Sequence, residues 1–196
     1  MKALDVGIDL DGCAYNFTAS VRKWAIKEGY DAEQVSGGDH EDENTTWNFF
    51  KDQWGMDAEE FFGLCARGVD AGVVFLEGEP FPGSVETITA LKSKGHYIHI
   101  VTNRQSGTRS KHNTADWLNE WQIPYDSLIF SDRKHLFSSL DIMVDDYEIN
   151  FRDLWSAGVE CWLYDRPWNR HVYDDGYRVK TWGEFESMVD RKAVEI

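Results

Sequence analysis

The chain has 196 residues, enough for one domain with a sizeable core or for a core domain that carries a substantial insertion. Thirty-five acidic residues against twenty basic ones give a formal charge of −15, which opposes binding to polynucleotides or anionic membranes. Three cysteines without a Cys-x-x-Cys pair indicate neither a disulfide framework nor a zinc site. No apolar run approaches the roughly 18 residues of a membrane span and no export signal is visible, so we expect a cytoplasmic protein with a small partner.

The first predicted element is a short apolar strand that ends in Asp9-Leu10-Asp11-Gly12. In a parallel sheet, ligands bind just beyond the carboxyl ends of the strands, so both aspartates are candidates for a site. Two carboxylates this close repel each other unless a cation or a proton lies between them, and oxygen ligands favour Mg²⁺. The pair therefore predicts a magnesium site. The alternative is an aspartate that only caps a turn at the end of the strand.

Residues 13–80 follow and are predicted to be mainly helical. Phe17, Val21 and Trp24 form one apolar face of a first helix, which starts directly after the aspartate pair and stops at Gly29.

An acidic cluster over residues 39–43 is interpreted as a solvated loop rather than a metal site. Aromatic residues are concentrated at 46–54. Asp57 and Glu60 then have the spacing of a capping box and predict the start of a further helix.

From residue 81 onward the chain alternates between predicted helices and predicted strands. The strands are expected over 96–101, 128–130, 140–144 and 159–164. The helices are expected after Ser84, which can act as an N-cap, over 110–121, after Asp146, and at the tail behind the capping box of Thr181 and Glu184. Their inward residues are predicted to be Val85, Ile88, Leu91, Trp117, Leu118, Trp121, Ile149, Phe151 and Leu154.

This alternation predicts an α/β fold with a doubly wound parallel sheet, because parallel strands need crossover connections. Residues 1–12 and 81–196 are assigned to the α/β core, and residues 13–80 to a helical cap inserted after the first strand. Three strands end in polar groups, and a loop between the second and the third supplies Lys134. The strand-end groups are Asp9 and Asp11, Thr102 and Asn103, and Asp145 and Asp146.

In this order, the Asp-x-Asp pair, the strand-end threonine, the downstream lysine and the late acidic pair resemble the haloacid dehalogenase superfamily. The resemblance implies a Rossmann-like core and a phosphatase in which Asp9 attacks phosphorus to form an aspartyl-phosphate. It makes Asp11 the general acid and then the base. It implies Mg²⁺ held by Asp9, the main-chain carbonyl of Asp11 and the pair Asp145 and Asp146, with Asp146 as the more direct ligand.

The same resemblance implies that Thr102, Asn103 and Lys134 bind the phosphoryl oxygens. Each member has an ordinary alternative. Thr102 can simply end a strand, Lys134 can be a solvated surface residue, and the late acidic pair can serve as turn and cap residues. Asp11 favours phosphoryl transfer over dehalogenation, because dehalogenases need no proton donor there.

A closer resemblance is to the 5′(3′)-deoxyribonucleotidase-like branch, including phage-type members, and it rests on residues 95–104 and 163–170. It implies a (deoxy)nucleoside monophosphate as substrate. Asn103 and Arg104 depart from the mammalian pattern, so nucleotide contacts cannot be carried over there. Trp168 and Asn169 are interpreted as an ordered turn.

A cap inserted directly after Asp11 sits above the phosphate site, which makes Trp47, Phe49 and Phe50 candidate contacts for a flat leaving group. The alternative is that these rings form the core of the cap. Arg104 is a further candidate substrate residue. A phosphatase for sugar phosphates or other small monoesters, and a phosphate-binding protein without turnover, remain rival hypotheses. The oligomeric state stays open, a homodimer included.

Overall fold

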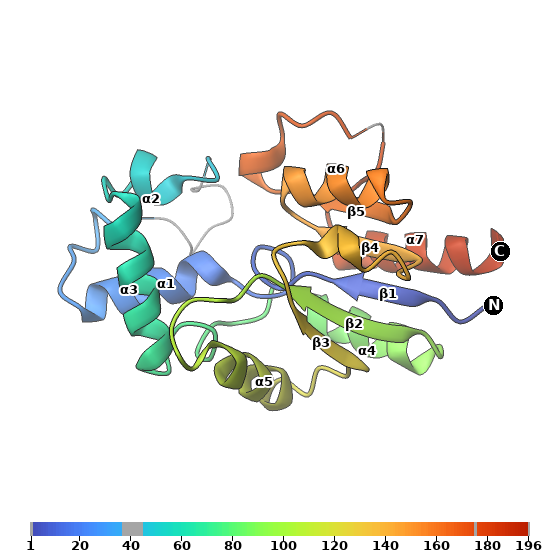
Figure 1. Ribbon diagram of the computed structural model, residues 1–196, viewed down its shortest axis with the longest axis horizontal. Helices are drawn as coiled ribbons and strands as arrows, with labels where there is room; N and C mark the ends of the chain where they lie inside the picture. Colours follow the sequence, from blue (N-terminus) through green and yellow to red (C-terminus); the bar gives the residue numbers. More distant parts are fainter. Residues whose placement is uncertain (1, 37–44, 175, 196) are drawn as a thin grey trace.

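The computed structural model of the protein describes residues 2–36, 45–174 and 176–195. Its centre is a six-stranded sheet with the order β3-β2-β1-β4-β5-β6, in which all neighbouring strands are parallel (Figure 1). The strands are β1 (Asp5–Ile8), β2 (Tyr97–Thr102), β3 (Ser127–Phe130), β4 (Ile142–Asp145), β5 (Glu160–Tyr164) and β6 (Arg178–Val179). The helices are α1 (Phe17–Lys27), α2 (Phe49–Asp52), α3 (Ala58–Asp70), α4 (Ser84–Ser93), α5 (Ser110–Glu120), α6 (Glu148–Ser156) and α7 (Trp182–Glu195), with short 3-10 turns η1 (Lys134–Leu136) and η2 (Pro167–Asn169).

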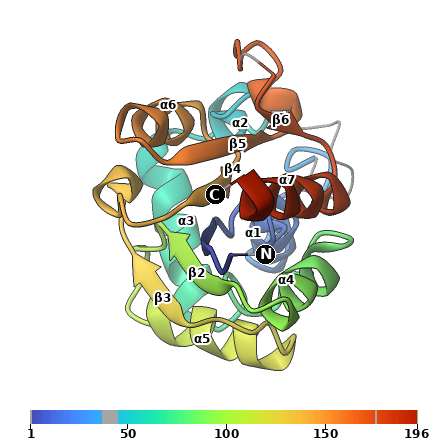
Figure 2. The same cartoon turned by 90° about the vertical axis from the view of Figure 1, so that its right-hand side faces the viewer.

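Helices cover both faces of the sheet, as the predicted doubly wound α/β fold requires. Successive strand residues point to opposite faces. Ile142 and Val144 of β4 therefore join the core formed with α4, α5 and α7, whereas Met143 joins the core formed with α6. Seen along the strands, α4 and α7 lie on one side of the sheet and α6 on the other (Figure 2).

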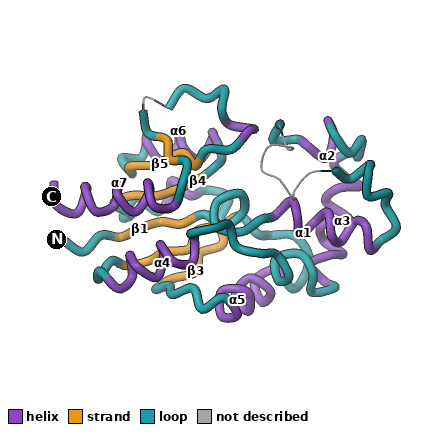
Figure 3. Tube along the Cα trace, turned by 180° about the vertical axis from the view of Figure 1, so that it is seen from behind, coloured by secondary structure: helices purple, strands orange, loops and turns teal. Residues whose placement is uncertain are grey.

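The chain forms α1 to α3 between β1 and α4, and these three helices, here called the inserted helices of the inserted segment, lie beyond the carboxyl ends of the strands (Figures 1 and 3). Side-chain bonds tie the end of α3 to the loop after β2 and to α5. Asp70 Oδ1 accepts the backbone N–H of Thr108 at 2.6 Å, and Asn113 Nδ2 donates to the carbonyl of Val69 at 2.7 Å. These contacts place the inserted helices over the edge of the sheet where β1, β2 and β4 end.

Two predicted helix starts differ from the structure. The helix α1 begins at Phe17 rather than directly after the aspartate pair, because Gly12–Asn16 forms a loop closed by a bridge between Asp11 and Tyr15. The side chain of Asn16 caps α1, and Gly29 ends it at a φ of 100°, as predicted.

The N-cap of α4 is Gly83, at a φ of 84°, and not Ser84. The hydroxyl of Ser84 points inward and donates to the carbonyl of Ala14. Asp57 caps α3 through the N–H of Glu60, as expected, but the Glu60 carboxylate accepts from Tyr30 and completes no capping box. The short edge strand β6 was not predicted, because two residues are too few for a period to be read.

Two predicted core residues are exposed. Ile149 is 53% exposed, because it lies two positions, about 200° of helix rotation, before the buried Phe151. Trp121 is 38% exposed, because α5 ends at Glu120 and the helical pattern no longer places it beside Trp117. The acidic cluster at 39–43 lies outside the described residues. In the described part of the chain, no helix combines the length and apolarity of a membrane span.

Candidate active site

The polar ends of β1, β2 and β4 meet at one cavity of about 530 Å³ beneath the inserted helices. Neighbouring strands of a parallel sheet end at the same edge, so groups that are far apart in the sequence come together there. Of the predicted site residues in the core, those that line the cavity are Asp9, Asp11, Asn103, Lys134 and Asp146. Thr102 and Asp145 are completely buried and do not line it.

Lys134 is not a surface lysine. Its side chain is 3% exposed, and its ammonium group donates to Asp9 Oδ1 at 2.5 Å and to Asp145 Oδ2 at 2.7 Å. Burial alone would lower the pKa of this amine, but the charges of Asp145 and Asp9 outweigh burial and the pKa of Lys134 is raised. The lysine is therefore a permanent cation between two carboxylates.

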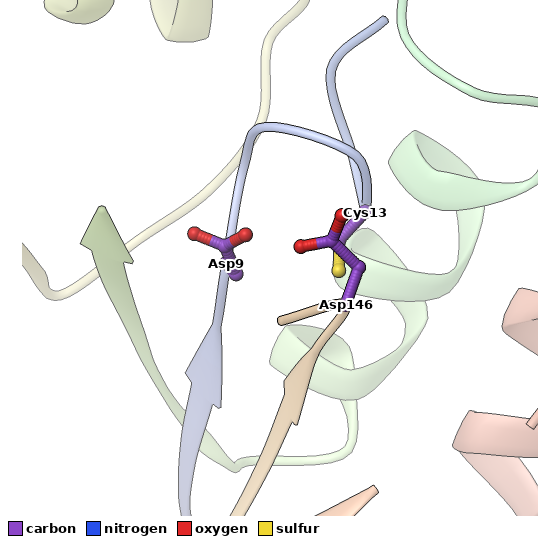
Figure 4. A group of neighbouring side chains, drawn as sticks. All are labelled: Asp9, Cys13 and Asp146. Atoms are coloured by element: carbon purple, nitrogen blue, oxygen red, sulfur yellow. The ribbon is translucent and has the colours of Figure 1, made fainter. Parts of the chain in front are cut away.

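Asp9 and Asp146 face each other across the loop that follows β1, with Cys13 beside them (Figure 4). One potential ligand atom from each of the three residues lies within 4.8 Å of the others. Burial raises the pKa of Asp9 to about 7, against the opposing effect of Lys134. Burial, followed by the charges of Asp9 and Asp145, also holds the pKa of Asp146 well above its usual range.

Such shifts mean that a further positive charge at this place is favourable, because it would stabilise both carboxylates in their ionised form. The carboxylates of Asp9 and Asp146 fit a hard cation. Burial holds the pKa of the Cys13 thiol well above its usual range, so the neutral sulfur is a weak ligand beside two carboxylates.

Asp145 and Asp146 have different partners although they are adjacent. Asp145 accepts from Lys134, from the N–H of Tyr147 at 2.9 Å and from Asn150 Nδ2 at 3.1 Å, so the protein already satisfies it. Asp146 lines the cavity, and its Oδ2 accepts from Trp168 Nε1 at 3.1 Å. This difference suits Asp146 better as a metal ligand.

Asp11 points to a different cation. Its side chain is 27% exposed, and Arg104 donates to it from Nη2 at 2.7 Å and from Nε at 3.1 Å. Arg104 itself is completely buried and does not line the cavity, so its placement does not fit the direct substrate contact predicted for it.

The two residues at the end of β2 differ in exposure. The hydroxyl of Thr102 is buried, and no partner for it is found among the described residues. A buried hydroxyl without a protein partner is costly, so the Thr102 hydroxyl can serve an oxygen of a ligand at this edge of the sheet. Asn103 is exposed at the cavity wall, where its side-chain oxygen accepts from Gln105 Nε2 at 2.9 Å.

The inserted segment contributes an aromatic wall that includes Trp47, Phe49 and Phe50. Trp47 is 46% exposed and stacks on Tyr147 of the core with ring centroids 4.2 Å apart. Phe49 is buried against Phe50 and other rings of the inserted segment, so for this ring the alternative of a cap core also holds. Phe50 is half-buried and stacks on Phe61 at 4.3 Å.

Sequence reasoning missed several lining residues, namely Tyr147, Asn150, Arg166, Trp168 and Phe81. Tyr147 directly follows the acidic pair in the sequence, and this position could have indicated that it lines the site. Asn169 is an ordered turn residue, as interpreted, but its Nδ2 also donates to the carbonyl of Asp146 at 2.9 Å. The turn thereby supports the carboxylate site.

The sheet order and the groups at the strand ends are those expected of an α/β phosphatase of the haloacid dehalogenase superfamily. The family model described as 5′ nucleotidase, deoxy (Pyrimidine), cytosolic type C protein matches residues 2–194. The chain belongs to that family and is therefore a nucleotidase-like phosphatase. A comparison with curated proteins found no match.

Solved structures share the fold over nearly the whole chain. A predicted phosphatase from Clostridium acetobutylicum has a TM-score of 0.66 at 14% identity, covering 97% of this chain and 100% of its own. The haloacid dehalogenase-like protein SP0104 from Streptococcus pneumoniae has a TM-score of 0.64 at 12% identity, covering 95% and 98%. A predicted phosphoglycolate phosphatase from Haemophilus somnus has a TM-score of 0.59 at 13% identity, covering 96% and 99%. At these identities the likeness concerns the fold alone.

Proposed function

We propose that the protein is a magnesium-dependent phosphomonoester hydrolase that acts through an aspartyl-phosphate on Asp9, with a (deoxy)nucleoside 5′-monophosphate as substrate. The observation that carries the proposal is the placement of Asp9. Asp9 accepts a hydrogen bond from the buried ammonium group of Lys134 and lies beside Asp146. It lines a cavity whose other wall is aromatic.

Asp9 and Asp11 have different tasks in the proposed reaction. Asp9 attacks phosphorus while the bond from phosphorus to the leaving-group oxygen breaks, and Asp11 gives its proton to that oxygen. In the second half, water attacks the phosphorus of the aspartyl-phosphate and Asp11 takes the proton of that water. Asp9 and phosphate are then released, and both aspartates return to their starting states.

The proposed Mg²⁺ site consists of Asp9, Asp146 and the main-chain carbonyl of Asp11, with Asp145 supporting it from behind through Lys134. When bound, the ion would offset the negative charges that otherwise oppose the approach of a phosphate dianion. The raised pKa values of Asp9 and Asp146 support a cation there, and carboxylate oxygens suit Mg²⁺.

Three groups are proposed to bind the phosphoryl oxygens: the Thr102 hydroxyl, the backbone N–H of Asn103 and the Lys134 ammonium. The unpartnered hydroxyl of Thr102 supports its part, because a phosphoryl oxygen would be a suitable acceptor. Lys134 would remain bonded to Asp9 and thereby keep the nucleophile oriented.

The aromatic wall supports a nucleobase as part of the leaving group. A base stacked on one aromatic side chain gains on the order of 1–3 kcal/mol in proteins that bind single-stranded nucleic acid, enough for tenfold discrimination or more. Trp47 is the best placed of the three predicted rings, because it is exposed and already stacks on Tyr147. Phe50 comes second, and Phe49 is mainly a packing residue.

The test is a phosphate-release screen with Mg²⁺ over nucleoside 5′- and 3′-monophosphates, sugar phosphates and aryl phosphates. We expect the deoxynucleoside 5′-monophosphates to have the highest kcat/KM, and Asp9→Asn to be folded but inactive. A preference for sugar phosphates would support the rival monoesterase, and one phosphate bound without release would support the binding protein. Turnover by Asp9→Asn would contradict the assigned nucleophile.

The division of the chain into a core (1–12 and 81–196) and a cap (13–80) stays a prediction, as do the cytoplasmic location and the oligomeric state.

A further inference from the structure

Arg104 and Asp11 form an ion pair that belongs neither to the proposed phosphate site nor to the proposed metal site. Arg104 lies in the loop after β2, and Asp11 lies in the loop after β1, 93 positions away. The arginine side chain is 0% exposed, whereas the aspartate lines the cavity. A buried cation thus approaches, from inside the protein, the carboxylate that the proposed reaction needs for proton transfer.

The guanidinium group is held in a fixed place. It lies over the rings of Tyr15 at 4.3 Å, Phe75 at 4.4 Å and Trp117 at 5.9 Å, and such cation–π contacts are strongest when the cation is desolvated. Its Nη1 donates to Thr114 Oγ1 at 3.3 Å. The main chain is also fixed, because Ser110 donates to the Arg104 carbonyl at 2.6 Å.

The bonds to the two oxygens of Asp11 are unequal. Oδ1 accepts from Nη2 at 2.7 Å and from Nε at 3.1 Å, whereas Oδ2 accepts only from Nε at 3.1 Å. A carboxylate has about four acceptor positions, two on each oxygen. The two contacts of Nε share its single N–H, so among the described residues Oδ1 has the bond from Nη2 and a share of the Nε–H, whereas Oδ2 has only a share of the Nε–H and is the less occupied oxygen.

We propose that Arg104 is a positioning residue that orients the Asp11 carboxylate so that Oδ2 exchanges the proton. The inference rests on the proposed function, in which Asp11 is acid and then base. Oδ2–H protonates the leaving oxygen as its bond to phosphorus breaks, and Oδ2 then takes a proton from the attacking water. Arg104 takes no part in the proton exchange itself, because a guanidinium group offers donors and no acceptor position.

The test is a double-mutant cycle with Arg104→Met and Asp11→Asn, measured on a deoxynucleoside 5′-monophosphate. Methionine keeps an unbranched apolar chain among the three rings but removes the donors. We expect Arg104→Met to lower kcat on the order of 10²-fold, as loss of a positioned general acid does, with KM changed less than about threefold. In the Asp11→Asn background the same change should alter kcat less than about twofold, because the residue through which it acts is gone.

Arg104→Lys separates charge from geometry. Lysine keeps the cation among the rings but cannot offer the planar fork, so we expect kcat between those of the wild type and Arg104→Met. This variant also serves if Arg104→Met does not fold. Lys92→Met, which removes an ion pair with Asp126 outside the cavity, is the control and should leave kcat unchanged.

An equal loss in the Asp11→Asn background would overturn the inference, as would a higher KM with unchanged kcat, which indicates direct substrate binding. A crystal structure of Arg104→Met in which Asp11 keeps its orientation would also overturn it. We expect that structure to have a displaced Asp11 carboxylate. Failure of the proposed function is distinguishable, since it would appear as turnover by Asp9→Asn or as no turnover by the wild type.

Discussion

Replacement of Lys134 by methionine tests how strongly the site depends on its buried cation. Methionine has a similar length and keeps the apolar packing, but it leaves the carboxylates of Asp9 and Asp145 facing each other in a buried place. The substitution removes the contacts of Lys134 Nζ with Asp9 Oδ1 at 2.5 Å and with Asp145 Oδ2 at 2.7 Å. All three side chains are no more than 6% exposed. Removal of one partner from such a buried group costs about 3–5 kcal/mol of unfolding free energy.

The loss of unfolding free energy caused by Lys134→Met should increase as the pH rises. The folded-state pKa of Asp9 is raised from 3.8 to about 7, so its protonated form contributes stability at low pH that is lost as the pH rises through this range. Without Lys134 the opposing effect of the ammonium is gone, and the pKa of Asp9 must rise further. We therefore expect Lys134→Met to lose more stability at about pH 8 than at about pH 5, relative to the wild type.

The assay is unfolding by urea in the presence of a chelator, so that no metal replaces the lost charge. The transition is monitored by the fluorescence of buried tryptophans such as Trp54, Trp117 and Trp182. Lys92→Met is the matched control. Its ion pair with Asp126 is partly exposed, and its loss should cost less than about 1 kcal/mol. A loss below about 1 kcal/mol for Lys134→Met, equal at both pH values, would refute the reasoning.

Three further predictions concern the cation, the first loop and the aromatic wall. Chelator should abolish phosphate release, and Asp146→Ala should raise the Mg²⁺ concentration for half-maximal activity at least about tenfold; activity in excess chelator would contradict this. Gly12→Ala should lower kcat roughly 10²-fold, because its φ is +83° and a Cβ would lie 2.1 Å from Asp146 Oδ2, whereas Gly29→Ala, at a similar φ with open space around it, should keep the wild-type kcat. Trp47→Leu should reduce the preference for a nucleotide over a small aryl phosphate about tenfold, whereas Phe49→Leu should mainly lower the thermal midpoint; an unchanged preference in folded Trp47→Leu would remove the support for stacking.

The strand-end groups could be predicted from the sequence because their positions follow from two simple rules. A short apolar run defines a buried strand, and parallel strands end at the same edge of the sheet. Those rules bring Asp9, Thr102 and Asp146 together without any knowledge of side-chain contacts. Lys134 lies in a short 3-10 turn without periodicity, so the pattern places it only in the loop between two strands, and its role at the phosphate rests on the family resemblance.

The contacts between loops could not be predicted. Arg104 reaches Asp11 across 93 positions, and Trp47 stacks on Tyr147 across the boundary of the inserted segment. Neither loop has a helical or strand period, and nothing in a local pattern says which loops will meet. The same limit explains why the sequence predicts a substrate contact for Arg104, whereas its side chain is buried and bonds Asp11.

The cations of the site explain how two aspartates only two positions apart can have different tasks. Lys134 neutralises Asp9 and Asp145, and Arg104 binds Asp11, so each member of the Asp-x-Asp pair has its own positive partner. Arg166, whose Nε donates to the Gly12 carbonyl, adds a third positive charge near Asp146. When all four carboxylates are ionised, as binding of a cation would favour, they exceed the three cations by one negative charge where a phosphate must enter. A divalent cation would reverse that sign. The charges of this chain's own residues therefore support the proposed magnesium requirement.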